Sequence, residues 1–335
     1  MRLFLIGATG YIGTVVAEYL QSDGHELVGL ARSQEAADQL RAAGIEPVRG
    51  ELGDVDVIAE QARATDGTVV VSTGGFILQA LLNQEPLLTT TDALIEALSG
   101  TGKPLVMTWG IAMWMDTGWI FPDRVVTEED PASWAYFYAH FAEAQRRLHA
   151  AGDDLRYIGI VPGGVYGRGG GYIGGITRFF DCIRKHGKMY AVAPGDNAAS
   201  HVHVDDLAQL YARALRSPDT RGYFIASSEI VTTMDVAKAV SEAAGLGGEV
   251  ELVDHRALRE LCGRFMEWDF WSNLRGSGQK AMDELGWRPT HRSVVEELRS
   301  LPRPLDLSSV YPAPSRRKAA VAASSLNQNE SPSKS

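Results

Sequence analysis

The sequence predicts an α/β fold, in which a doubly wound parallel sheet carries helices on both faces and a small lobe follows toward the C-terminus. Three observations support this prediction. Apolar strands alternate with helical segments over the first 161 residues, a pattern typical of a parallel sheet. The first strand runs directly into a glycine-rich turn, and the composition changes abruptly after Val161.

The turn has the spacing Gly-x-x-Gly-x-x-Gly, preceded by an apolar strand and followed by apolar residues at helical spacing. Glycine has no Cβ, so the backbone can turn tightly and a pyrophosphate can approach it closely. The helix that begins near Tyr11 would direct its amide groups and the positive end of its dipole at the phosphates. The residues expected to contact a dinucleotide are Gly7, Thr9, Gly10, Tyr11, Ile12 and Gly13.

The remaining elements follow in order, without an internal repeat. Gly44 and Gly100 stand where helix C-caps are expected, and Pro131 stands where the first turn of a long helix tolerates proline. The expected strands are 2–6, 26–30, 45–49, 68–72, 103–108, 155–161 and 222–226, and the expected helices are 11–22, 33–43, 86–99, 131–151 and about 174–187.

The second half of the chain is organised differently. Residues 162–171 form a glycine-rich loop, and 201–208 are interpreted as a strand end followed by an Asp-capped helix. We expect a dinucleotide-binding domain formed by 1–165 and about 200–226, and a substrate-binding lobe formed by about 166–199 and 227–305. Residues 312–335 have few large apolar side chains and are expected to be a disordered tail.

The composition and the hydropathy pattern argue against several kinds of partner and against a membrane or secreted protein. The chain has 335 residues, 45% of them hydrophobic, and a formal net charge of −10, which argues against nucleic acid or an anionic membrane as the main partner. It has no signal-peptide pattern and no apolar run of about 18 residues, so a cytoplasmic protein is expected. A homodimer is compatible with the sequence.

Cys182 and Cys262 stand far apart without metal-type spacing and are expected to be two reduced, buried thiols.

Four motifs carry a resemblance to a known family: residues 7–13, 161–167, 203–208 and 284–289. In this order they resemble the extended and atypical short-chain dehydrogenase/reductase families, grouped with the NAD-dependent epimerase/dehydratases, to about residue 300. The resemblance implies a Rossmann-type sheet, a bound nicotinamide dinucleotide and a ligand pocket between the two lobes. It also implies cofactor contacts at Thr73, Gly74, Pro162, Gly163 and Val165.

The residues after the second strand indicate which cofactor is used. An NAD site has an acidic residue here for the ribose 2′-hydroxyl, whereas NADP requires a cation for the 2′-phosphate. This chain has Arg32 and Ser33 and no carboxylate, so NADP is favoured over NAD. The alternative is that Arg32 is a solvated charge at a helix start.

The expected catalytic centre is altered. The resemblance implies a Tyr-x-x-x-Lys pair on the long helix and a hydroxyl after the fifth strand, which move a proton while hydride is transferred. Aligning residues 142–144 with the family pattern places Phe137 and Phe141 at the tyrosine and lysine positions. Neither ring can carry a proton. Thr108 is the nearest hydroxyl to the serine position.

Other side chains on the same helix can replace the missing pair. A shift of one residue brings Tyr136 and His140 to i, i+4 on one face, and Tyr138 is a further donor. The alternative is an aromatic wall in which His140 is a hydrogen-bonded, partly buried imidazole. The candidate catalytic residues are therefore Tyr136, Tyr138, His140 and Thr108.

Two classes of function remain open. The first is an NADPH-dependent reductase of a C=O or C=C bond, and the second is a non-redox isomerase, cyclase or dehydratase, or a nucleotide-sensing regulator similar to the NmrA-like proteins. Many large aromatic residues outside the sheet favour a bulky hydrophobic small molecule over a nucleotide sugar. Arg168 would be a polar anchor for it or an ordinary surface charge. No metal site is expected, and we interpret His201, His203, Asp205 and Asp206 as part of a strand-to-helix junction.

Overall fold

In the computed structural model, the positions that can be described are 1–71, 85–114, 118, 120–133, 139–168, 175–262, 272–291 and 293–301, without the side chains of residues 139, 140, 175 and 177. Thr73, Gly74, Tyr136, Tyr138 and the segment 312–335 therefore lie outside the described residues.

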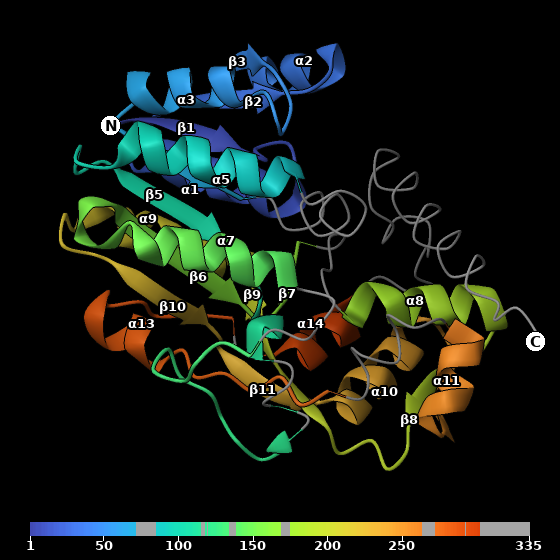
Figure 1. Cartoon of the computed structure of the whole chain (residues 1–335). Coiled ribbons are helices and arrows are strands. Elements are labelled where there is room, and N and C mark those ends of the chain that lie inside the picture. The colour runs from blue at the N-terminus through green and yellow to red at the C-terminus, as the bar shows by residue number, and fades with distance from the viewer. Residues whose placement is uncertain are drawn as a thin grey trace, which may run out of the picture.

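The centre of the molecule is a parallel sheet of seven strands in the order β10-β6-β5-β4-β1-β2-β3 (Figure 1). The order reverses between β1 and β4, which leaves a crevice at the carboxyl ends of these strands. The predicted α/β fold is confirmed. The strands are β1 (Arg2–Ile6), β2 (Glu26–Ala31), β3 (Glu46–Arg49), β4 (Gly67–Val70), β5 (Pro104–Thr108), β6 (Arg156–Pro162) and β10 (Gly222–Ala226).

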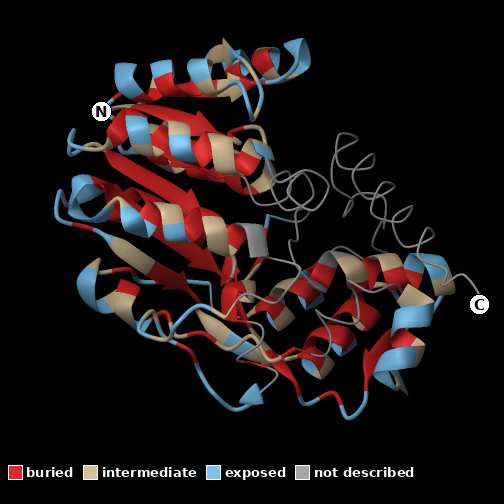
Figure 2. Ribbon diagram, in the orientation of Figure 1, coloured by how far each residue is buried: buried red, intermediate tan, exposed pale blue. Residues whose placement is uncertain are grey.

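Helices cover both faces of this sheet, so its strands are apolar throughout. In β1, Leu3 and Leu5 pack into one core and Phe4 and Ile6 into the other, as expected where both faces are buried. Figure 2 shows the buried sheet between helices with exposed outer sides. One face carries α1 (Tyr11–Ser22), α2 (Gln34–Ala42) and α9 (Val204–Arg216), and the other carries α3 (Val55–Ala64), α5 (Glu85–Leu98) and α7 (Ala139–Ala150).

A smaller lobe has its own core, in which Phe179 and Phe180 pack with Val240 and Leu258. Its strands form a three-stranded sheet, β11-β9-β7, and a two-stranded sheet, β12-β8. The strands are β7 (Gly164–Tyr166), β8 (Tyr190–Val192), β9 (Ala198–His203), β11 (Glu229–Thr232) and β12 (Glu251–Val253). The helices of this part of the chain are α8 (Gly175–His186), α10 (Thr233–Ala243), α11 (His255–Cys262), α13 (Gln279–Glu284) and α14 (Val294–Ser300). No helix within the described ranges combines the length and the apolar character needed to span a bilayer.

Two expectations about helices were wrong. Helix α3 was missed because its buried side is made of Ile58, Ala59 and Ala62, and such small residues give a weak periodic signal. The helix expected from 131 does not include residues 131–133. The Ser133 amide instead donates to the Met113 carbonyl at 2.8 Å, which ties this segment to the 3-10 turn at Ile111–Trp114. Pro131 is therefore not in a first helical turn.

The packing of α1 predicts the effect of one substitution. A Cβ at Gly13 would lie 2.0 Å from the Gly7 carbonyl oxygen, a contact that only a backbone shift can relieve. Gly13→Ala should lower the free energy of unfolding by about 1–3 kcal/mol, measured by urea denaturation. Gly110→Ala is the control, because no atom lies within 4 Å of a Cβ there. Equal stability of the two variants would contradict the packing described.

Candidate functional site

The glycine turn lies between β1 and α1 at the carboxyl edge of the sheet. Gly7 has φ of 94°, a conformation that favours glycine, and its carbonyl accepts a hydrogen bond from the Gly10 amide at 3.0 Å. Gly10 is the N-cap of α1 and provides no side-chain cap, so the first-turn amides point beyond the helix end. Thr9 is partly exposed, whereas Ile12 and Gly13 are buried. The turn thus fits the diphosphate of a dinucleotide.

Two arginines lie at the carboxyl ends of the neighbouring strands. Ser33 caps α2, and its Oγ accepts from the Ala36 amide at 3.1 Å. Arg32 is exposed just before this helix, and among the described residues it has no ion-pair partner. Ala31 pairs with Arg49 across β2 and β3, and Arg49 is also exposed. Both cations lie near the start of α2.

Residues 162–165 connect the central sheet to the lobe. Pro162 ends β6, and the Gly163 amide donates to the Ala226 carbonyl at 3.2 Å. A Cβ on Gly163 would lie 2.3 Å from the Ser200 carbonyl oxygen, so this glycine permits a close approach of two backbones. Val165 is 1% exposed and packs in the core. Any contact of Val165 with a ligand would have to come from its backbone.

Aromatic rings and hydrogen-bonded hydroxyl groups pack together at the end of β5. The Oγ1 of Thr108 donates to the Val70 carbonyl at 2.9 Å and also contacts the Tyr211 hydroxyl. Phe141 is 7% exposed and meets Trp109 edge to face, with ring centroids 6.1 Å apart. The indole of Trp109 donates to the Tyr157 hydroxyl. The position aligned with the family lysine is therefore filled by a packed phenyl ring. His140 lies in α7, but its side chain is outside the described residues.

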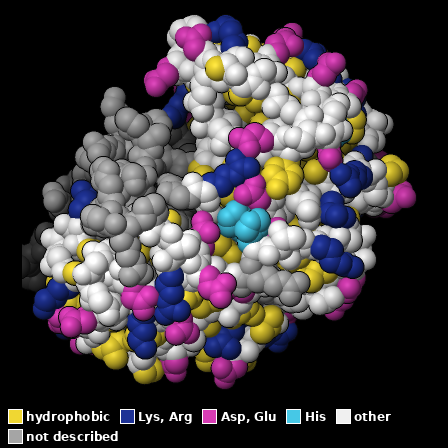
Figure 3. Space-filling view, turned by 180° about the vertical axis from the view of Figure 1, so that it is seen from behind, with side chains coloured by type: hydrophobic (Ala, Val, Ile, Leu, Met, Phe, Trp, Pro, Cys, Tyr) yellow, Lys and Arg dark blue, Asp and Glu magenta, His cyan; other side chains and the backbone are white. Residues whose placement is uncertain are grey.

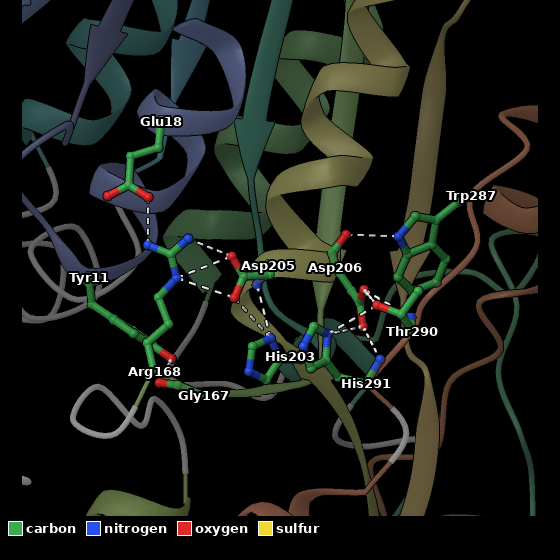
Figure 4. A network of polar contacts seen from close by, with 10 residues as sticks. All are labelled: Tyr11, Glu18, Gly167, Arg168, His203, Asp205, Asp206, Trp287, Thr290 and His291. Carbon is green, nitrogen blue, oxygen red and sulfur yellow. Dashed lines mark hydrogen bonds and ion pairs between the residues drawn. The ribbon is translucent and has the colours of Figure 1, made fainter. Parts of the chain in front are cut away.

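Arg168 is the centre of a polar network that the sequence did not predict (Figure 4). Its Nη1 lies 2.6 Å from a Glu18 oxygen on α1, and its Nη2 lies 2.6 Å from a carboxylate oxygen of Asp205 on α9. The preceding carbonyl, that of Gly167, accepts a hydrogen bond from the Tyr11 hydroxyl at 2.9 Å. The network therefore joins the glycine turn to the start of the lobe, and Arg168 is already paired with two acids.

Two histidines extend this network. His203 is the N-cap of α9, and its Nδ1 accepts from the Asp205 amide at 3.2 Å. The interpretation of an Asp cap was therefore wrong. The ring of His203 stacks on His291 with centroids 3.7 Å apart. Asp206 instead binds the later segment, accepting from the amides of Thr290 at 3.0 Å and His291 at 2.9 Å.

Charge and burial set the protonation of these groups. Burial, followed by the nearby His291, lowers the pKa of His203. Burial would raise the pKa of Asp205, but the hydrogen bonds and charge of Arg168 lower it overall. His203, Asp205 and His291 are close enough to hold a metal ion. However, the guanidinium of Arg168 pairs with the Asp205 carboxylate, and the Nδ1 of His203 already accepts a hydrogen bond from the Asp205 amide. We therefore assign an ion-pair network here.

Basic and acidic side chains both lie on the surface around this network (Figure 3). On the face shown in Figure 3, histidine side chains lie among both basic and acidic ones, and the two charges alternate over the rest of the face.

His291 was the residue that the sequence analysis missed. The one signal was its place just after the 284–289 motif, which says nothing of its distance from His203.

The Arg168 network predicts a loss of stability when the guanidinium is removed. Arg168→Ala should lower the free energy of unfolding by about 1 kcal/mol, because Glu18 and the mostly buried Asp205 lose their partner. Alanine keeps a Cβ at this residue of φ 55°, so backbone strain is unchanged.

Urea denaturation at low and high salt measures the effect, and salt should shrink it. Arg216→Ala, which breaks an exposed pair with Asp23, is the control and should cost less than about 0.5 kcal/mol. A loss no larger than that of the control would contradict a structural role for Arg168.

Comparisons with known proteins show what this chain is similar to. A protein of Saccharomyces cerevisiae, "Uncharacterized protein YLL056C", is 28% identical over 312 residues, covering 90% of this chain and 98% of that protein. A ketoreductase of Stigmatella aurantiaca, whose name gives a farnesylated dihydroquinoline oxide as its substrate, is 25% identical over 285 residues and covers 77% of this chain and 78% of its own.

Solved structures of other proteins have a similar fold. The UDP-glucose 4-epimerase of Thermus thermophilus, in complex with NAD, has a TM-score of 0.67 at 22% identity, covering 89% of this chain and 97% of that chain. The model of the NAD dependent epimerase/dehydratase family matches residues 3–226. These residues include the glycine turn, nearly all of the seven-stranded sheet and the His203 to Asp206 junction. The chain therefore belongs to the NAD-dependent epimerase/dehydratase family.

Proposed function

We propose that this protein binds NADP(H) and reduces a C=O or C=C bond of a bulky hydrophobic small molecule. The observation that carries the cofactor choice is the exposed Arg32, which has no ion-pair partner among the described residues, directly before the Ser33 cap of α2. NADP differs from NAD by a phosphate on the adenosine ribose, which requires a cation. Arg49, on the neighbouring strand end, provides a second positive charge for the same phosphate.

The glycine turn supports binding of the diphosphate part of this cofactor. Its uncapped first helical turn offers backbone amides, and their hydrogen bonds to an anion are stronger than those to a neutral group. When bound, the reduced nicotinamide supplies the hydride. Thr108 can donate a proton only by giving up its bond to Val70, so Tyr136, Tyr138 and His140 remain the preferred donors.

The choice of substrate rests on the many large aromatic residues outside the sheet, which suit a hydrophobic ligand where they line its site. Trp109 and Phe141 make the region beside the end of β5 aromatic, but both are buried in the core. The similarity to a ketoreductase whose named substrate carries a farnesyl group supports the same class. A nucleotide sugar would call for more charged groups here.

A second function is favoured by one observation. Phe141, at the position aligned with the family lysine, is packed against Trp109 and cannot lower the pKa of a neighbouring phenol. A non-redox isomerase, cyclase or dehydratase, or an NmrA-like sensor of the nucleotide, would not need that lysine for hydride transfer. A reductase oxidises NADPH as it reduces its substrate, whereas these other functions do not, so net oxidation of the cofactor distinguishes them.

The cofactor proposal predicts a reversal of preference. Arg32→Glu should weaken NADPH binding at least about tenfold, because it removes a charge-assisted hydrogen bond and adds repulsion. NADH binding should be unchanged or tighter. Nucleotide fluorescence titration measures both affinities.

Arg41→Glu, at the far end of α2, is the matched control and should change neither affinity. If Arg32→Glu leaves the NADPH to NADH ratio unaltered, Arg32 is a solvated charge and the preference for NADP has no basis.

The reductase proposal predicts oxidation of NADPH by hydrophobic ketones or enones, followed at the absorbance of the reduced nicotinamide. Tyr136→Phe or Tyr138→Phe should lower kcat by about 10²-fold or more at whichever residue is the proton donor, with NADPH affinity retained. Nucleotide binding without oxidation across a broad panel would favour the non-redox or sensor function. Unchanged turnover in both variants would remove both tyrosines as donors.

A further inference from the structure

The small lobe contains two cysteines that the sequence separates widely and the fold brings together. Cys182 on α8 and Cys262 at the end of α11 have sulfur atoms 2.9 Å apart, well inside the contact distance of two non-bonded sulfur atoms. Both are free thiols. The expectation of two reduced, buried thiols is wrong for the burial of Cys262, which is partly exposed. The sequence spacing did not indicate that the two sulfur atoms meet.

We propose that Cys182 and Cys262 are a reversible modification site, at which a small-molecule disulfide converts the two thiols into a disulfide bond that joins α8 to α11.

Contacts between the two helices hold the sulfurs in place. The Leu261 carbonyl accepts a hydrogen bond from the Lys185 ammonium at 2.8 Å and lies 2.8 Å from the His186 Nε2. Leu258, one turn before Cys262, is fully buried in the same core as Cys182. The end of α11 is thus fixed on α8 by groups other than the thiols. A bond between the sulfurs needs little rearrangement of the backbone.

The two thiols have different environments, which assigns them different roles. Cys262 is partly exposed, and its pKa is lowered by the hydrogen bond from Cys182 and also by Lys185, against an opposing effect of burial. Cys182 is 3% exposed, and the hydrogen bond to Cys262 and burial raise its pKa. Thiolates rather than thiols attack disulfides. Cys262 is therefore the attacking group, and Cys182 resolves the intermediate.

The exchange balances with a disulfide oxidant such as glutathione disulfide. The Cys262 thiolate attacks one sulfur of the oxidant, forms a mixed disulfide and releases one glutathione thiolate, which takes a proton. The Cys182 thiol then loses its proton, attacks the Cys262 sulfur and releases the second glutathione. The protein loses two protons and two electrons, which together are two hydrogen atoms, and the oxidant gains them as two glutathione thiols.

The test uses the full chain, reduced and then equilibrated with glutathione disulfide. We expect the intact mass to fall by two hydrogen atoms and peptide mapping to find one linked pair, Cys182 with Cys262. The bond closes a loop of 80 residues, so the oxidised protein should melt about 5–10 °C higher than the reduced one. Dithiothreitol should reverse both changes.

Single variants test the assigned order. Cys182→Ser should accumulate glutathione on Cys262, because nothing resolves the mixed disulfide, and Cys262→Ser should leave Cys182 unmodified while folded. Differential alkylation of the wild-type chain reports the same order if a variant does not fold. A wild-type chain that keeps glutathione on Cys262, or that keeps two free thiols under these conditions, would overturn the proposal. None of these readouts depends on nucleotide binding or turnover.

Discussion

The missing side chain at Gly13 is the constraint on which the candidate site depends. Because no Cβ separates α1 from the Gly7 carbonyl, the helix begins directly above the end of β1. Its first amides then face the crevice where the strand order reverses. The same placement brings Tyr11 within hydrogen-bond distance of Gly167 and Glu18 within reach of Arg168. A shift of α1 would therefore disturb both the nucleotide turn and the connection to the lobe.

The sequence predicted the parts of the structure that local pattern determines. The glycine turn, the alternation of strands with helices and the C-cap glycines Gly44 and Gly100, both at φ 71°, follow from backbone sterics and periodic burial. Contacts between distant residues could not be predicted in this way. Asp206 binds the amides of residues 290 and 291, and Cys182 meets Cys262 across 80 residues. The segment that begins at Pro131 shows the opposite case: the Ser133 amide donates to the Met113 carbonyl, and residues 131–133 are not helical despite the local helix signal.

Trp109 and Phe141 form an edge-to-face aromatic contact beside the end of β5. The family fold is retained around the glycine turn, and these rings pack beside the hydroxyl groups of Thr108 and Tyr157. A packed ring also excludes water, which strengthens any remaining charge interaction near it. In the function proposed above, binding of the nucleotide depends on the glycine turn and Arg32, whereas catalysis depends on other residues.

The path of the chain between the two sheets has a consequence for its synthesis. The chain leaves the central sheet after β6, forms β7 and β9 in the lobe, and returns to supply β10 at the edge of the central sheet. During translation, the β6 edge therefore stays unpaired until residue 222 has emerged. Unpaired strand edges template aggregation. Over this interval of about 60 residues the nascent chain carries a strand edge that β10 covers in the folded protein.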